Sequence, residues 1–152
     1  FTSLNPYRVR VTGRTKQHIN VFGEELMVEN ADRALSKACA LTQTEVIDYT
    51  VAPIFMDGKA KGAHEWIIEF RENPKNVAEF SRILDLELQA INSDYEAKRY
   101  NNMTLNPLVL NLARPNLFYD WLKDRGKLGG QHKIPRLSNT REYVEQLKEL
   151  SA

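Results

Sequence analysis

The sequence lacks the features that mark secreted, membrane-spanning and polyanion-binding proteins. It contains one cysteine, Cys39, which excludes an internal disulfide and a cysteine-rich zinc site and fits a reducing compartment such as the cytoplasm. No apolar run approaches the ~20 residues needed to cross a membrane. The 21 basic and 20 acidic residues give a net charge of +1, which does not indicate binding to nucleic acid or to a membrane surface.

The remaining composition is that of one globular domain. The chain has 152 residues, of which 42% are hydrophobic and 27% are charged, and both fractions are ordinary for a soluble protein. It begins at Phe1 without an initiator methionine and without the basic and apolar regions of a signal peptide. We therefore expect residues 1–152 to be a single domain of a longer protein.

Several stretches have the pattern of β-strands. Residues 7–12 alternate apolar and polar side chains, and residues 17–21 are predicted to return as the second strand of a hairpin. The clearest hairpin joins residues 46–55 to residues 64–70 across a turn that contains Asp57 and Gly58. A further strand is predicted at residues 108–112.

Helices are predicted between and after these strands. One begins near Asn30 as N-cap, and a long one runs from the N-cap Asn76 to about Tyr100. A short helix begins at residues 115–116, and Asn139 with Glu142 resembles the cap of a last helix. This order predicts an α+β fold, with a mostly antiparallel sheet packed against helices in a ferredoxin-like arrangement.

Some reactive side chains are assigned structural roles. Cys39 lies beside Ala38 on a predicted helix, with no adjacent histidine or basic residue, which favours a small buried side chain. His64 cannot share a metal ion with Glu65 or Glu69, because odd and even strand positions face opposite sides. The carboxylates of the long helix lie off its apolar stripe and are predicted to face solvent: Glu79, Asp85, Glu87 and Asp94. No metal site is predicted.

The first chemically distinctive stretch covers residues 11–26 (VTGRTKQHINVFGEEL). Gly13 and Gly23 interrupt its apolar pattern, and Arg14 and Lys16 lie between them near the predicted hairpin tip. Judged by pattern alone, this is a polar turn between two glycines.

The second stretch covers residues 127–137 (KLGGQHKIPRL). Gly129–Gly130 makes the backbone permissive, and Pro135 holds the following segment extended. A flexible segment that carries Lys133 is suited to bring positive charge to a phosphate or to a developing oxyanion. A solvated basic turn is the alternative, because basic loops are common.

Together the two stretches resemble motifs of the adenylate-forming superfamily, which includes acyl-CoA synthetases, peptide-synthetase adenylation domains and luciferases. VTGRTKQHINVFGEE at residues 11–25 resembles the hinge motif, and QHKIPR at residues 131–136 resembles the C-terminal catalytic-lysine motif. The form GQHKIPR and the long helical segment between the motifs are most similar to the acyl-acid amido synthetases. That branch is known from auxin and jasmonate conjugation in plants and also occurs in bacteria, and a bacterial-type member is expected here.

The resemblance implies roles for individual residues. Arg14 would approach the nucleotide, and Gly13 and Lys16 would form the hinge about which this domain rotates, where many relatives have aspartate instead of Lys16. Gly23 would lie on the loop that turns toward the active site in the second half-reaction. Lys133 would bridge the acyl carboxylate and the α-phosphate during adenylation.

The resemblance also implies a two-step ligase reaction. A carboxylic acid attacks the α-phosphate of ATP, with Mg²⁺ on the phosphates, to give an acyl-adenylate and pyrophosphate. An amine, commonly an amino acid, then displaces AMP to form an amide. The acyl pocket and most ATP contacts would lie in a large N-terminal adenylation domain that this sequence does not contain, so the fragment alone is expected to be inactive.

Two alternatives to this interpretation remain. The domain could serve an acyl-CoA ligase, but Gln131-His132 replaces the usual Ser-Gly pair and Glu24 replaces a common basic residue, which weakens that analogy. A free-standing ferredoxin-like regulatory module that binds a small molecule also fits the pattern. RNA binding is disfavoured by the charge balance and by the lack of an aromatic and basic strand signature.

Overall fold

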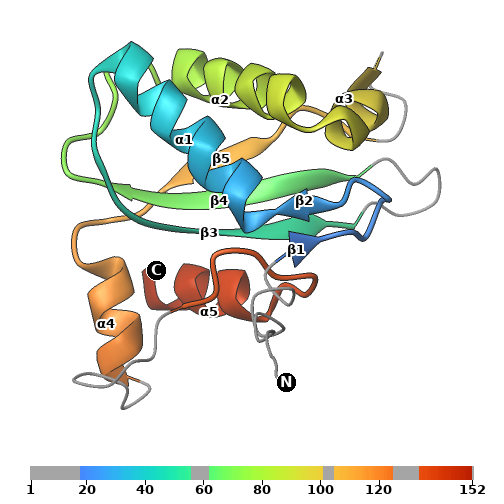
Figure 1. The fold of residues 1–152 in the computed structure, drawn as a ribbon. Coiled ribbons are helices and arrows are strands. Elements are labelled where there is room, and N and C mark those ends of the chain that lie inside the picture. Colours follow the sequence, from blue (N-terminus) through green and yellow to red (C-terminus); the bar gives the residue numbers. More distant parts are fainter. Residues whose placement is uncertain (1–17, 56–61, 101–104, 125–133, 152) are drawn as a thin grey trace, which may run out of the picture.

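The computed structural model describes residues 18–55, 62–100, 105–124 and 134–151. A three-stranded sheet lies between two layers of helices (Figure 1). Its strands are β3 (Val46–Ile54), β4 (Ala63–Phe70) and β5 (Val109–Leu112), in the order β3-β4-β5. The predicted α+β class is therefore confirmed.

The central strand β4 pairs differently with its two neighbours. It is antiparallel to β3, with Val51 opposite Trp66, which confirms the predicted hairpin. It is parallel to β5, with Trp66 opposite Leu110. Every residue of β4 is buried, because helices cover both of its faces.

The first helical layer contains α1 (Val28–Thr42), α2 (Val77–Ile91) and α3 (Ser93–Arg99) (Figure 1). Apolar side chains of α1 and α2 meet alternate residues of β3 and β4 in a core that includes Leu35, Phe80 and Trp66. The Trp66 ring stacks on Tyr49 at a centroid distance of 5.3 Å. Cys39 is half-buried against this core, where the sequence predicted a buried side chain, and burial raises the pKa of its thiol.

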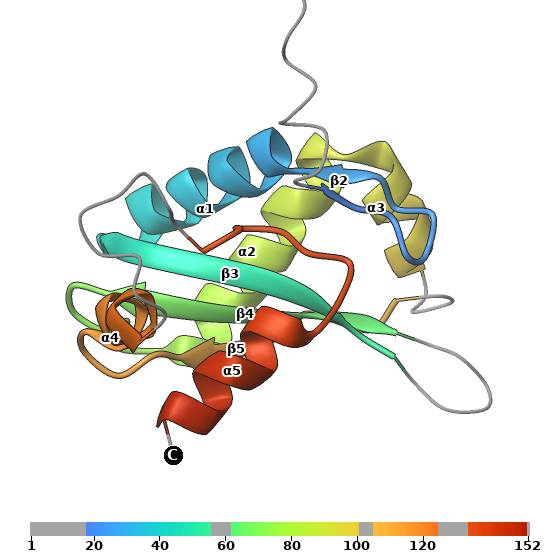
Figure 2. The same ribbon diagram turned by 90° about the horizontal axis from the view of Figure 1, so that it is seen from below.

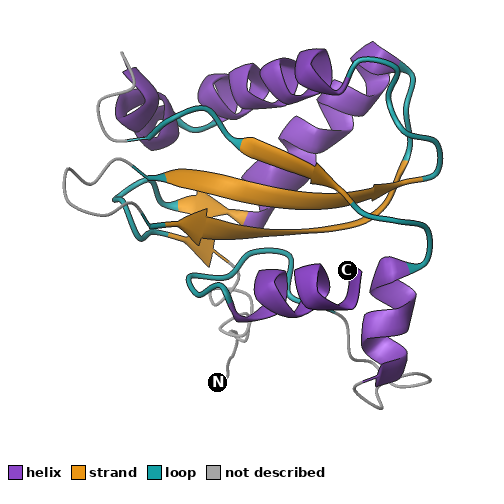
Figure 3. Cartoon of the chain, turned by 180° about the vertical axis from the view of Figure 1, so that it is seen from behind, coloured by secondary structure: helices purple, strands orange, loops and turns teal. Residues whose placement is uncertain are grey.

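The second layer contains α4 (Leu117–Asp124) and α5 (Glu142–Ser151), which lie on the opposite face of the sheet (Figures 2 and 3). Their apolar side chains form a second core with Ala52 of β3 and Ile67 of β4, which point to this face of the sheet. Trp121 and Leu147 are buried there. The two cores are separated by the sheet, so each is built by one set of helices.

Three predicted helix boundaries are wrong. Helix α1 begins at Val28, and Asn30 lies in its first turn, where its side chain accepts a hydrogen bond from Met27 N at 3.0 Å. The predicted long helix is two helices, because Asn92 ends α2 and its side chain caps α3 through Tyr95 N at 2.8 Å. Asn139 does not cap α5, since its side chain binds the backbone of His18 and Asn20.

A short two-stranded sheet lies beside the N-terminus of α1 (Figure 1). It pairs β1 (His18–Ile19) with β2 (Leu26–Met27) in antiparallel fashion. The predicted strand at residues 17–21 is thus partly confirmed, with a partner that the sequence did not indicate. The strand predicted at residues 7–12 lies outside the described residues.

Candidate functional site

Residues 20–25, the glycine loop, form the turn between β1 and β2. It is closed by hydrogen bonds from Gly23 N to Asn20 O at 3.3 Å and from Glu25 N to Asn20 Oδ1 at 3.0 Å. Gly23 has a φ of +83°, a conformation that favours glycine. Of the site residues predicted from the resemblance, Gly23 is the one that lies within the described parts of the chain, and it occupies the bend of this loop.

The described part of the second motif is fixed along β3. Val51 N donates to Arg136 O at 2.8 Å, and Ser138 N donates to Val51 O at 3.1 Å. The buried Thr50 hydroxyl donates to Pro135 O at 2.7 Å. Ile134 and Leu137 are 4% and 1% exposed, so this segment, residues 134–138, is anchored in both cores.

Asn139 joins the two motif regions directly. Its Nδ2 donates to His18 O at 2.8 Å, and its Oδ1 accepts from Asn20 N at 2.9 Å, across 121 and 119 positions of sequence. The segment that follows the second motif therefore lies beside β1, which opens the glycine loop. Figure 1 shows this contact, where the orange-red segment before α5 runs next to β1.

Arg136 is held between α1 and β3. Its guanidinium lies 5.5 Å from the Tyr49 ring centroid and 3.7 Å from Asp32 Oδ2. The Tyr49 hydroxyl donates to Asp32 Oδ1 at 2.5 Å, and burial together with this carboxylate raises the pKa of Tyr49. The cluster ties the segment at residues 134–138 to α1 as well as to the sheet.

A buried hydrogen-bonded pair that the sequence did not indicate fixes the interior of the glycine loop. Glu24 Oε2 lies 2.6 Å from His64 Nε2, and both side chains are 0% exposed. The alternation of the strand correctly placed His64 on the face opposite Glu65 and Glu69, but it did not predict Glu24 as the hydrogen-bond partner of His64. Within the described ranges, no group of three or more histidine, cysteine, aspartate or glutamate side chains could hold a metal ion.

The prediction for Asp85 is wrong. Its side chain is buried, accepts a hydrogen bond of 2.5 Å from the Tyr95 hydroxyl, and pairs with Arg99 at 2.7 Å. Burial and the neighbouring Asp85 carboxylate raise the pKa of Tyr95. This cluster joins α2 to α3 and stabilises the turn at Asn92.

Another buried carboxylate, Glu65, lies on the face of β4 opposite His64. Glu65 is 3% exposed and pairs with Arg141 and Lys148, each at 2.7 Å, while Asn111 donates to it from β5. Burial alone would raise the pKa of Glu65, but the hydrogen bonds from Lys148 and Arg141 outweigh it and hold the pKa below its ordinary value. The group anchors α5 to the sheet.

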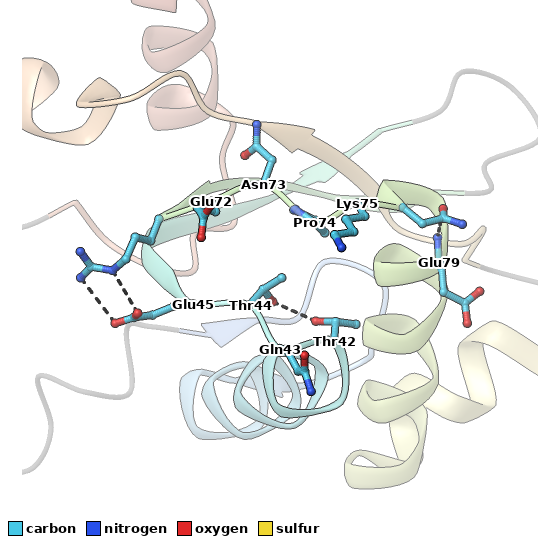
Figure 4. A pocket seen from close by; sticks show the side chains of 11 residues that line it. Thr42, Gln43, Thr44, Glu45, Glu72, Asn73, Pro74, Lys75 and Glu79 are labelled. Carbon is cyan, nitrogen blue, oxygen red and sulfur yellow. Dashed lines mark hydrogen bonds and ion pairs between the residues drawn. The ribbon is translucent and has the colours of Figure 1, made fainter.

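A hollow of about 590 Å³ opens at the other end of the sheet (Figure 4). It is lined by residues that follow α1 and β4, including Gln43, Asn73 and Lys75. Its charged groups are partly paired with each other, as in the contact of 3.0 Å between Arg71 and Glu45. Because the glycine loop lies at the opposite end of β4, this hollow is separate from the candidate site.

The other predicted site residues, Gly13, Arg14, Lys16 and Lys133, lie outside the described residues. Asn139, three residues after the second motif, contacts the described part of the first motif through His18 O and Asn20 N. Among the described segments, no helix is long and apolar enough to span a membrane.

Most of the chain matches the model of a known protein family. The family model described as the GH3 family C-terminal domain matches residues 29–142, which is most of the chain. The chain belongs to the GH3 family. The match includes the second motif of this GH3 domain and begins after the glycine loop. No curated protein matched the sequence.

Solved structures support the same fold. The GH3 domain superposes on the GH3.15 acyl acid amido synthetase with a TM-score of 0.70 and 18% identity over 90% of its length. The AtGH3.15 acyl acid amido synthetase in complex with 2,4-DB gives a TM-score of 0.69 and 15% identity. The GH3 domain spans 26% of the length of each of those chains.

Proposed function

We propose that this GH3 domain is the mobile C-terminal domain of an ATP-dependent acyl-acid amido synthetase. The full-length enzyme would adenylate a carboxylic acid and transfer the acyl group to an amine, most simply an amino acid. Its partner would be its own N-terminal adenylation domain, and it would act in the cytoplasm. A bacterial-type member of the family remains our prediction.

The contact made by Asn139 is the observation that best supports this proposal. In the proposed mechanism, one rotation of the domain removes the lysine motif from the active site and brings in the glycine loop. The two motifs must therefore move together as parts of one rigid domain. Asn139, which follows the lysine motif, holds the described part of the hinge motif through contacts of 2.8 Å to His18 O and 2.9 Å to Asn20 N. The two hydrogen bonds between residues 136–138 and Val51 fix the described end of the lysine motif to β3 of the three-stranded sheet.

In the first step, the carboxylate oxygen would attack the α-phosphate of ATP and pyrophosphate would leave. Lys133 would stabilise the negative charge that develops on the carboxylate and phosphate oxygens. The next residue in the chain, Ile134, is buried, so the segment that carries Lys133 is anchored at its C-terminal end. The described residues supply no acidic cluster for Mg²⁺, so its ligands would be ATP phosphates and groups of the N-terminal domain.

In the second step, the amine nitrogen would attack the acyl carbon, AMP would leave, and the amine would lose a proton. The domain would first rotate about Gly13 and Lys16, which removes Lys133 and brings the glycine loop to the active site. Arg14 would stay close to the nucleotide. A few backbone positions can absorb such a rotation because the rest of the domain has two packed cores.

Pyrophosphate exchange by the full-length enzyme tests the first step. Lys133→Ala should lower exchange by roughly 100-fold, the usual effect of removing one group that stabilises developing charge. Lys127→Ala, in the same basic stretch, is the matched control and should retain exchange. Intact exchange in Lys133→Ala would contradict the catalytic assignment.

A second pair of variants tests the hinge. Lys16→Pro should impair amide formation while sparing pyrophosphate exchange, because proline restricts the backbone rotation. Lys16→Ala keeps the backbone free and should retain both activities if the side chain is not needed. Equal loss of exchange and amide formation in Lys16→Pro would count against a hinge. Formation of a thioester with CoA instead of an amide would assign the domain to an acyl-CoA ligase.

A further inference from the structure

The interior of the glycine loop is organised by the Glu24 carboxylate. Its Oε1 accepts a hydrogen bond from Phe22 N at 2.8 Å, and its Oε2 lies 2.6 Å from His64 Nε2. The side chain is 0% exposed. A buried carboxylate is costly unless it is fully paired, so this loop conformation depends on both contacts.

His64 reaches the loop from β4 and is enclosed by aromatic rings. Phe22 and Tyr95 lie 6.4 and 5.5 Å from its ring, measured between centroids. Its Nδ1 is buried and has no hydrogen-bond partner among the described residues. The tautomer with the proton on Nε2 therefore fits best, because it donates to Glu24 and leaves no unpaired N–H group.

Independent contacts fix the two ends of the loop. Asn139 holds its start through Asn20 N, and Asn92 Nδ2 donates to Glu25 O at 3.1 Å at its end. Asn92 is also the residue that separates α2 from α3, so the break in the helical layer supplies a contact to the loop. The Glu24–His64 pair lies between these two anchors, next to Gly23.

We propose that Glu24 and His64 are positioning residues for the amide-forming step. They fix the backbone next to Gly23 through Phe22 N, so that the loop enters the active site in one conformation. This inference rests on the proposed function of the glycine loop. Neither side chain would touch the substrate, because both are fully buried.

Two measurements on the full-length enzyme separate the steps. Pyrophosphate exchange, with the carboxylic acid that supports the fastest wild-type exchange, reports adenylation. Amide formation with each of the twenty amino acids reports the second step. Glu24→Gln should lower kcat for amide formation by roughly 10- to 100-fold, since misplacement of a positioning element by about 1 Å has effects of that size. Exchange and the KM values for ATP and acid should be unchanged.

Glu65→Gln is the matched control, because Glu65 is a buried, paired carboxylate on the other face of the same strand. It should leave the ratio of amide formation to exchange at the wild-type value. Removing one partner of a buried pair is destabilising, whereas replacing both with apolar residues often is not. The double variant Glu24→Leu/His64→Leu should therefore restore thermal stability relative to Glu24→Leu, but not amide formation.

The outcomes distinguish this inference from the proposed function. A wild-type ratio of amide formation to exchange in both Glu24→Gln and the folded double variant would overturn the positioning role and leave the proposed function intact. If Glu24→Gln fails to fold, the double variant alone decides. Absence of exchange by the wild-type enzyme with every acid tested would overturn the proposed function and this inference together.

Discussion

Replacing Asn139 tests whether the two motif regions are held together as described. In Asn139→Ala the chain loses the hydrogen bonds to His18 O and from Asn20 N. Each bond contributes about 1 kcal/mol when buried, but both are exposed here and water can replace part of them. We expect a loss of about 1 kcal/mol in the free energy of unfolding.

Urea unfolding of the chain measures this loss. With a denaturant dependence of about 2 kcal/mol per M, the unfolding midpoint should fall by about 0.5 M. Thr140→Ala, at the neighbouring exposed position, is the control and should change stability by less than about 0.5 kcal/mol. Hydrogen exchange of the Asn20 amide should also accelerate in Asn139→Ala. An effect no larger than that of Thr140→Ala, with unchanged exchange at Asn20, would refute the proposed link.

Three other substitutions test the packing and electrostatics of the domain by urea unfolding. Gly62→Ala should destabilise it by about 1–3 kcal/mol, because the added Cβ would lie 2.1 Å from Phe22 Cζ. Gly23→Ala should cost about 1 kcal/mol through its φ of +83°, with little added by Lys98 Cε at 3.1 Å, which can move. Glu65→Gln should lower the free energy of unfolding of the domain more at neutral pH than at acidic pH. Because its cationic partners lower the folded-state pKa of Glu65, its contribution is complete above the unfolded pKa of about 4.3 and is lost as pH falls through the folded value.

Each of these expectations has a result that would contradict it. If truncation of Phe22 to alanine in the Gly62→Ala background restored no stability, the clash would not be the cause. A large rescue of Gly23→Ala by Lys98→Ala would assign the loss to contact and not to the backbone. A difference between wild type and Glu65→Gln that stayed constant down to about pH 3 would contradict the lowered pKa of Glu65.

The sequence predicted the sheet hairpin well and the helical boundaries less well. Alternation at residues 46–54 and 63–70 is a local property, and it was enough to place β3 and β4. The break at Asn92 was missed because Tyr95 remains in phase with the apolar stripe of α2 although it lies on a separate helix. The parallel direction of β5 also has no local signal, since side-chain alternation is the same in both directions.

The sequence motifs located the candidate site, but they did not predict the long-range contacts that hold it. Gly23 was assigned to a turn from its residue type, and its positive φ agrees with that assignment. Glu24 carried no sign of burial, because its partner His64 is 40 positions away and a charged residue in a turn is ordinarily exposed. Asn139 looked like a helix cap because the same side chain can accept from any nearby amide, and tertiary structure supplied Asn20 instead.

The consecutive residues His64 and Glu65 of β4 also specify which alignment of the strand can form. His64 faces Glu24 on one side of the sheet, and Glu65 faces Arg141 and Lys148 on the other. A shift of β4 by one position would exchange these faces. In the direction that puts Glu65 at the place of His64, Glu65 would meet the Glu24 carboxylate in a buried environment, and Arg141 and Lys148 would lose their acidic partner. The order of His64 and Glu65 in β4 therefore also disfavours a misaligned β3-β4 hairpin during folding.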